Sequence, residues 1–176
     1  MKYLLISFLT LLLQACSTTY QNQQILGKAF PLVEGTSLSD ELIEIPKHFS
    51  GNNTLLLIGY KQASQFDIDR WLIGLDMTET LVDVYEIPTI QGLFPRMFSP
   101  LIDEGMRKGI PKELWKGVIT VYNDGEKVQQ FTGNENGNNA RVVLLDKSGM
   151  ITYFYDRGFS VQALNALRQQ LVKDRR

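Results

Sequence analysis

The polar side chains best suited to chemistry are gathered in one short stretch of the sequence. They are Lys61, Gln62, Ser64, Gln65, Asp67 and Arg70. Such groups could recognise a protein or a small anion, because they precede a predicted helix whose N-terminus favours negative charge. The alternative interpretation is structural: Ser64 would cap that helix, and Asp67, three residues later, would complete a capping box with it.

Composition limits sulfur and imidazole chemistry. Cys16 is the only cysteine and His48 the only histidine of the sequence. One cysteine cannot form an intrachain disulfide, and one histidine cannot build a multi-histidine metal site. Composition leaves a carboxylate-only site possible, but the polar loop at positions 132–139 holds one acid, too few for a calcium loop. The hydroxyl of Ser64 has no neighbouring histidine to act as a base. We therefore expect no catalytic residue, no metal ligand and no cofactor.

The first residues have the pattern of an export signal. Met1-Lys2 supplies a positive charge, and an apolar run from Tyr3 to Leu13 follows it. This run is shorter than the ~20 residues of a membrane span, but it fits the core of a secretory signal peptide. The run ends in Leu13-Gln14-Ala15-Cys16, which resembles a bacterial lipobox.

The lipobox resemblance implies a lipid anchor on Cys16, because cleavage after Ala15 would make this cysteine the acylated N-terminus. Two or three acyl chains hold a protein stably at a membrane. Ser17, in place of an aspartate, favours the outer membrane on its periplasmic side. We therefore expect a lipoprotein signal peptide over residues 1–15, a polar lipid-anchored tether over 16–26 and a folded domain over 27–176.

The stretch from Thr54 to Asp76 must position the polar residues named first. Its apolar run from Leu55 to Ile58 predicts a buried strand that ends at Gly59. After the polar turn, apolar residues recur at helical spacing and predict an amphipathic helix. They are Phe66, Ile68, Trp71, Leu72 and Leu75. Strand, tight turn and helix open a βαβ unit, in which the chemistry often lies at the turn.

The rest of the chain carries further strand and helix signals. The sequence predicts a second strand at Thr80–Ile87, a helix at Pro100–Lys108, a third parallel strand at Val118–Tyr122, a hairpin of Ala140–Asp146 with Met150–Tyr155, and a helix at Ser160–Lys173. Two segments stay open. Ser37–Ile45 fits a short strand or the start of a helix, and Glu126–Phe131 fits a short helix or a returning hairpin strand.

The order of these elements resembles that of the thioredoxin fold in its peroxiredoxin-like form. The resemblance implies an α/β fold class: a thioredoxin-like (peroxiredoxin-type) three-layer α/β/α sandwich with a central mixed sheet. Two segments, LLLIGYKQASQFDIDRWL and VVLLDKSGMITYFYDRGF, are also similar to the bacterial relatives of the mitochondrial ATP-synthase assembly factor number ten. The lipobox, however, places this chain in a different compartment from the ATP-synthase headpiece, so that assembly role does not carry across directly.

One departure from the thioredoxin-like pattern decides the expected chemistry. In thioredoxin-like enzymes, the turn after the apolar strand carries the reactive cysteine, whose thiolate attacks a disulfide or a peroxide. This chain has Ser64 in that turn. We therefore expect a domain without thiol-redox activity.

Two functions remain open. The first is a binding or assembly factor for an unidentified envelope protein, acting through the Lys61–Gln65 turn or through exposed apolar residues at Leu93-Phe94 and Met97-Phe98. The second is a small-ligand binder or a non-thiol enzyme that uses Lys61, Ser64 and Arg141 around the former active-site crevice. The net charge of −1 gives no general attraction to nucleic acid, so the expected partners are a membrane and a protein.

Overall fold

The computed structural model describes residues 18–175, except for the side chains of Leu93 and Phe94. The predicted signal peptide and Cys16 lie outside the described residues. Among the described residues, no helix is long and apolar enough to cross a membrane.

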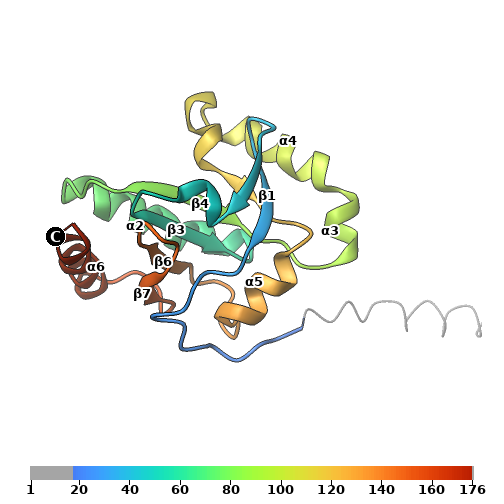
Figure 1. The fold of residues 1–176 in the computed structure, drawn as a ribbon. Coiled ribbons are helices and arrows are strands. Elements are labelled where there is room, and N and C mark those ends of the chain that lie inside the picture. Colours follow the sequence, from blue (N-terminus) through green and yellow to red (C-terminus); the bar gives the residue numbers. More distant parts are fainter. Residues whose placement is uncertain (1–17, 176) are drawn as a thin grey trace, which may run out of the picture.

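A four-stranded mixed sheet forms the centre of the molecule (Figure 1). Its strands, in spatial order, are β4 (Asp83–Pro88), β3 (Thr54–Gly59), β6 (Arg141–Leu145) and β7 (Ile151–Tyr155). β3 runs parallel to β4 and antiparallel to β6, and β7 returns antiparallel to β6. All positions of β3 are buried, which explains its continuous apolar run.

Two helices cover one face of this sheet. They are α2 (Gln65–Met77) and α6 (Val161–Asp174), and their apolar sides meet around the fully buried Trp71. Ser160 caps α6 as predicted, because its side chain accepts a hydrogen bond from the N–H of Ala163. The prediction that Phe66 belongs to the buried side of α2 is wrong, since its side chain is 72% exposed.

The opposite face packs against a second sheet and a helix. This sheet has the order β2 (Leu42–Ile45), β1 (Val33–Ser37) and β5 (Ile119–Thr120), and the helix is α5 (Gly125–Thr132). The structure thus resolves both open segments: Ser37–Ile45 contributes strand β2, and Glu126–Phe131 is helical.

The predicted third parallel strand at Val118–Tyr122 is wrong in extent and in main partner. Only Ile119–Thr120 is a strand, and it pairs antiparallel with β1. Its neighbours Val118 and Val121 form isolated parallel bridges to the β4 region. Pro88 lies between those two bridges and has no N–H, so a continuous ladder cannot form there.

Helices α3 (Leu93–Met97) and α4 (Ser99–Gly109) project from this body. α4 confirms the predicted helix with a proline in its first turn. Its polar side faces the body: Asp103 accepts a hydrogen bond from Tyr122 Oη at 2.9 Å, and Arg107 Nε donates to the carbonyl of Leu38 at 2.9 Å. Three short 3₁₀ turns complete the described elements: η1 (Lys47–Phe49), η2 (Gln62–Ser64) and η3 (Lys112–Gly117).

Residues 18–26, part of the segment predicted to be a tether, lie along the folded body. Tyr20 exchanges hydrogen bonds with Asn134, Gln23 N donates to the carbonyl of Thr132, and Ile25 is fully buried. The polarity of this segment did not indicate these contacts, because most of them are made by backbone groups and amides rather than by an apolar face.

Candidate functional site

The candidate site is a groove between the β3–α2 turn and helix α4, with a volume of about 530 Å³. It is lined by Gly59, Tyr60, Lys61, Gln62, Ser64, Gln65, Ile68, Pro88, Ile90, Ile102, Gly105 and Met106. The groove lies at the carboxyl ends of β3 and β4, where ligands of α/β sheets commonly bind. It brings together four of the seven predicted binding residues: Lys61, Gln62, Ser64 and Gln65.

The turn itself is built around Ser64. The Ser64 side chain is buried, and its Oγ donates to the carbonyl of Lys61 at 2.7 Å. A Cβ added to Gly59 would lie 2.6 Å from this Oγ, so the strand must end in glycine. The predicted cap at Ser64 is wrong: the residue already has helical dihedral angles and makes no capping hydrogen bond.

Asp67 lies on the other side of α2, away from the groove. Its buried carboxylate accepts from the N–H of Ala140 at 2.9 Å and from the N–H of Phe159 at 2.6 Å. The predicted capping box with Ser64 is therefore absent here as well. Asp67 instead joins α2 to the start of β6 and to the loop before α6.

Arg141 is fully buried and also lies outside the groove. Its guanidinium donates to the carbonyls of Gly133 (3.1 Å), Asn136 (2.7 Å) and Asn139 (2.9 Å), and to Asn22 Oδ1 (3.2 Å). Burial lowers the pKa of Arg141 from its ordinary value. The convergence of Lys61, Ser64 and Arg141 on one pocket, which the enzyme hypothesis requires, is not found.

Tyr60 links Arg141 to the turn. The guanidinium carbon of Arg141 lies 5.0 Å from the centroid of the Tyr60 ring, which is a cation–π geometry. The Tyr60 hydroxyl shares a hydrogen bond with Thr132 Oγ1 on α5, and burial raises the pKa of Tyr60 to about 12. Arg141 therefore supports the wall of the groove from behind.

The rim of the groove is polar and partly fixed. Gln65 Nε2 donates to Asp69 Oδ1 at 3.0 Å and to Glu86 Oε2 at 3.1 Å, and burial raises the pKa of Glu86. The Lys61 side chain is exposed and lies over Gly137, where an added Cβ would be 3.0 Å from Lys61 Cε. Arg70 is exposed on α2 and does not line the groove.

The apolar wall was not anticipated. It is contributed by Ile68, Pro88, Ile90, Ile102 and Met106. Ile102 and Met106 are four residues apart and point to one side of a helix whose neighbours Asp103, Glu104, Arg107 and Lys108 are charged. That spacing was a usable signal for an apolar helix face, although it did not show which surface the helix would face.

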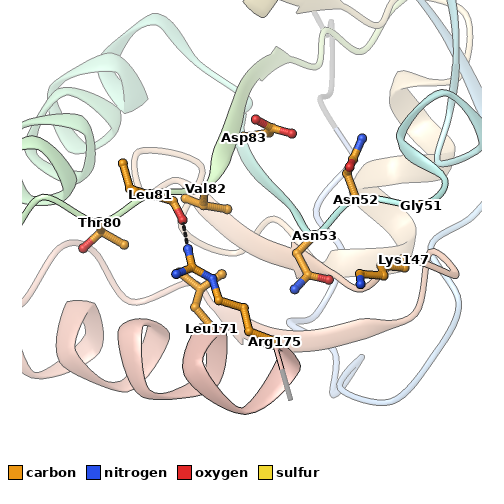
Figure 2. Close-up of a pocket in the computed structure, with 10 residues that line it drawn as sticks. All are labelled: Gly51, Asn52, Asn53, Thr80, Leu81, Val82, Asp83, Lys147, Leu171 and Arg175. Atoms are coloured by element: carbon orange, nitrogen blue, oxygen red, sulfur yellow. Dashed lines mark hydrogen bonds between the residues drawn. The ribbon is translucent and has the colours of Figure 1, made fainter.

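A second cavity, of about 590 Å³, lies at the other end of the sheet (Figure 2). It is lined mainly by loop residues, including Asn52, Thr80 and Lys147, and Arg175 donates to the carbonyl of Leu81 across it. This cavity lies at the amino ends of β3 and β4, away from the turn that carries the predicted binding residues.

The groove combines an apolar wall with a polar rim. The Ser64 hydroxyl already donates a hydrogen bond to the carbonyl of Lys61. None of the described residues that line the groove is a histidine or a cysteine. Within residues 18–175, no group of three or more metal-ligating side chains is assembled. Apolar walls with an amide and ammonium rim suit a segment that presents both apolar and polar groups.

Comparison with solved structures identifies the architecture. A thiol peroxidase from Chromobacterium violaceum aligns with a TM-score of 0.57 at 12% identity, over 90% of this chain and 91% of that chain. A SCO1/SenC family lipoprotein from Bacillus anthracis aligns with a TM-score of 0.58 at 10% identity, over 89% and 100%. The chain adopts the thioredoxin-like fold. The predicted α/β fold class with a central mixed sheet is confirmed.

The thioredoxin-like fold is also shared with the exposed lipoprotein thioredoxin of Streptococcus pneumoniae, with a TM-score of 0.54 at 10% identity over 80% of this chain and 99% of that chain. No protein-family model and no curated protein match the sequence. At these identities, the structural likeness shows the fold alone. In this thioredoxin-like chain, the groove lies at the β3–α2 turn, the turn that carries the reactive cysteine in thioredoxin-like enzymes.

Proposed function

We propose that this protein is a membrane-anchored lipoprotein of the periplasm whose redox-inactive thioredoxin-like domain binds a protein of the cell envelope. The observation that carries the proposal is the groove itself: an apolar wall and a polar rim occupy the turn that would hold a thiol, and the turn has Ser64 instead. The domain retains the recognition surface of the fold without the group that would perform redox chemistry.

The lipid anchor is part of the same proposal. The lipobox at Leu13–Cys16 supports it, and the solved lipoproteins from Bacillus anthracis and Streptococcus pneumoniae carry the same fold in anchored proteins. Ser17 favours the outer membrane as the anchoring surface. The similarity of two segments to relatives of the ATP-synthase assembly factor supports a role for this domain in the assembly of an envelope protein, in a compartment other than that of the ATP-synthase headpiece.

The absence of redox turnover follows from the side chains at the turn. We expect the domain of residues 18–176 to reduce neither insulin disulfides nor hydrogen peroxide above the buffer rate, because no thiolate is available to attack them. An insulin turbidity assay and a peroxide consumption assay measure this. Turnover in either assay with pure protein contradicts the proposal.

Site-specific photo-crosslinking in living cells tests the binding site. We would place a benzophenone amino acid at Gln62, on the rim of the groove, and at Gln162, an exposed position on α6, as the matched control. We expect an adduct of defined mass at Gln62 and none at Gln162. Met106→Glu should remove the adduct, because it places a charge on the apolar wall.

Two results would count against protein binding at the groove. Equal adducts at Gln62 and Gln162 indicate random collision, and an adduct that survives Met106→Glu moves the site elsewhere.

The volume of about 530 Å³ also falls within the range of small-molecule sites, so a small-ligand binder is the second candidate. A small ligand predicts no adduct at Gln62, together with a purified protein that retains a bound compound visible by native mass spectrometry.

A further inference from the structure

Helix α4 turns a mixed side toward the body, with Ile102 and Met106 at the groove and charged residues beside them. Its charged residues Asp103 and Arg107 bond to the body, while no residue of α4 is buried. Three apolar residues around the junction of α3 and α4 remain in solvent: Met97 at the end of α3 is 66% exposed, Phe98 55% and Leu101 in α4 71%. We call these three residues the outer apolar face. A surface helix normally turns its apolar side inward, so this face is available for another surface.

The docked N-terminal segment shows where the membrane lies relative to this face. Asn134 Nδ2 donates to the carbonyl of Thr18 at 2.9 Å, and Tyr20 Oη donates to Glu126 Oε1 at 2.6 Å in the first turn of α5. Just before α5, the carbonyl of Asn123 accepts a hydrogen bond from Arg96 of α3. The described chain therefore starts beside α5, and both this start and α3 lie on the side of the molecule opposite α6 (Figure 1).

The chain that precedes Thr18 is too short to let the domain drift away. One residue, Ser17, lies between Cys16 and Thr18, and these two residue steps span at most about 7 Å. Under the proposed function, on which this inference rests, Cys16 carries the acyl chains. The end of the molecule formed by α5 and α3 is then held at the lipid headgroups.

We propose that the outer apolar face of Met97, Phe98 and Leu101 rests in the lipid surface to which the N-terminal segment leads. Amphipathic helices at membrane interfaces bury an apolar face and keep cationic groups at its edge. Arg96, directly before this face, is an exposed cation, and Lys108, two turns after Leu101, is exposed and paired with Glu104 at 3.7 Å. The acyl chains and the outer apolar face then bind the same bilayer. Together they limit how the domain can rotate relative to the membrane.

Fluorescence quenching in vesicles tests the proposal. The mature lipoprotein is prepared with a single added cysteine, Leu101→Cys or Phe98→Cys, and labelled with an environment-sensitive dye. Because the sulfur of Cys16 is lipidated, only the engineered thiol reacts. Asn165→Cys on α6 is the control. The protein is reconstituted into phosphatidylethanolamine and phosphatidylglycerol vesicles that carry nitroxide-labelled headgroups.

We expect the nitroxide lipids to remove most of the emission at positions 101 and 98 and to leave that at position 165 unchanged. If the protein floats with the vesicles but the dye is unquenched at both positions 101 and 98, the outer apolar face does not contact the lipid. The proposal is then wrong, although the lipid anchor is present. Protein that does not float overturns the anchor as well. Disulfide crosslinking between two Leu101→Cys chains identifies a second copy as the occupant and also overturns the proposal.

Discussion

Arg141 shows how one buried cation can organise a site that it does not touch. Its guanidinium is satisfied by three backbone carbonyls of the 133–139 loop, by Asn22 Oδ1 and by the face of Tyr60. A buried charge is tolerated only when its hydrogen-bonding groups are occupied in this way. Arg141 therefore holds the loop, the N-terminal segment and the groove wall in one arrangement.

Arg141→Met should lower the free energy of unfolding by about 3 kcal/mol, because the substitution leaves the buried Gly133 carbonyl and two partly buried carbonyls without their donor. Urea denaturation followed by circular dichroism measures the loss. Arg70→Met is the matched control: Arg70 is exposed, and we expect a change within about 0.5 kcal/mol. Equal midpoints for the two variants would show that Arg141 is not structural.

Asp146 gives the hairpin turn a defined pH dependence. Partial burial raises its pKa, but hydrogen bonds from Ser148 Oγ and from the N–H groups of Met150, Ser148 and Gly149 outweigh this effect and lower the pKa from 3.8. A depressed pKa stabilises the fold above the unfolded value, and that stabilisation is lost as pH falls through the folded value.

Asp146→Asn should therefore cost about 1 kcal/mol at neutral pH, a modest value because the turn is partly exposed to solvent. The difference from the wild type should shrink as the pH falls through and below 3.8. Urea denaturation of both proteins across this pH range measures it. A difference that is independent of pH would assign the cost to geometry rather than to charge.

Local patterns were sufficient to predict several elements. The continuous apolar run of β3, the helical spacing of Ile68, Trp71 and Leu75, and the Asp-Lys-Ser-Gly turn of the β6–β7 hairpin are signals carried by adjacent residues. These elements formed as predicted because tertiary packing favours the same local conformation. The polar half of the groove followed from them, since Lys61–Gln65 must connect β3 to α2.

The sequence patterns did not predict which hydrogen-bond and strand-pairing partners these residues would have. Ser64 and Asp67 fit a capping box by spacing, but the structure uses them for the Lys61 carbonyl and for the N–H groups of Ala140 and Phe159. The strand at Ile119–Thr120 was assigned to the central sheet, although β1 offered an antiparallel edge. For Asp67 and for Ile119–Thr120, the competing partner lies far away in the sequence, whereas Ser64 bonds to a carbonyl only three residues before it.

The β3–α2 junction predicts a coupled pair of mutations. Gly59→Ala should cost about 2 kcal/mol, because the new methyl group would be 2.6 Å from Ser64 Oγ and 3.2 Å from Ile68 Cδ1. Ser64→Ala alone should cost about 1 kcal/mol through the lost hydrogen bond to Lys61. The double variant should lose about 1 kcal/mol less than the sum, because removing Oγ makes room for the methyl group. Additive losses in urea denaturation would refute this contact as the reason for glycine.

The N-terminal segment of residues 18–23 is linked to the groove through a series of contacts. It lies so close to the loop after α5 that a Cβ at Gly133 would collide with Asn22 Cα and the carbonyl of Gln21. Asn22 bonds to Arg141, Arg141 packs on Tyr60, and Tyr60 lines the groove. A segment that composition assigned to a tether is therefore a structural part of the domain.

A chain that starts at Gln24 should unfold with about 3 kcal/mol less free energy than one that starts at Thr18, because Arg141 and Asn134 lose their partners in residues 18–23. Hydrogen exchange should also accelerate at Tyr60 and along the Lys61–Gln65 turn, which Arg141 supports through Tyr60. Asn22→Ala in the longer chain should reproduce part of both effects, whereas Gln24→Ala, at an exposed position outside these contacts, should reproduce neither. If the shorter chain were equally stable and its turn equally protected, residues 18–23 would be a passive tether, and the orientation of the domain on the membrane would not be determined by its fold.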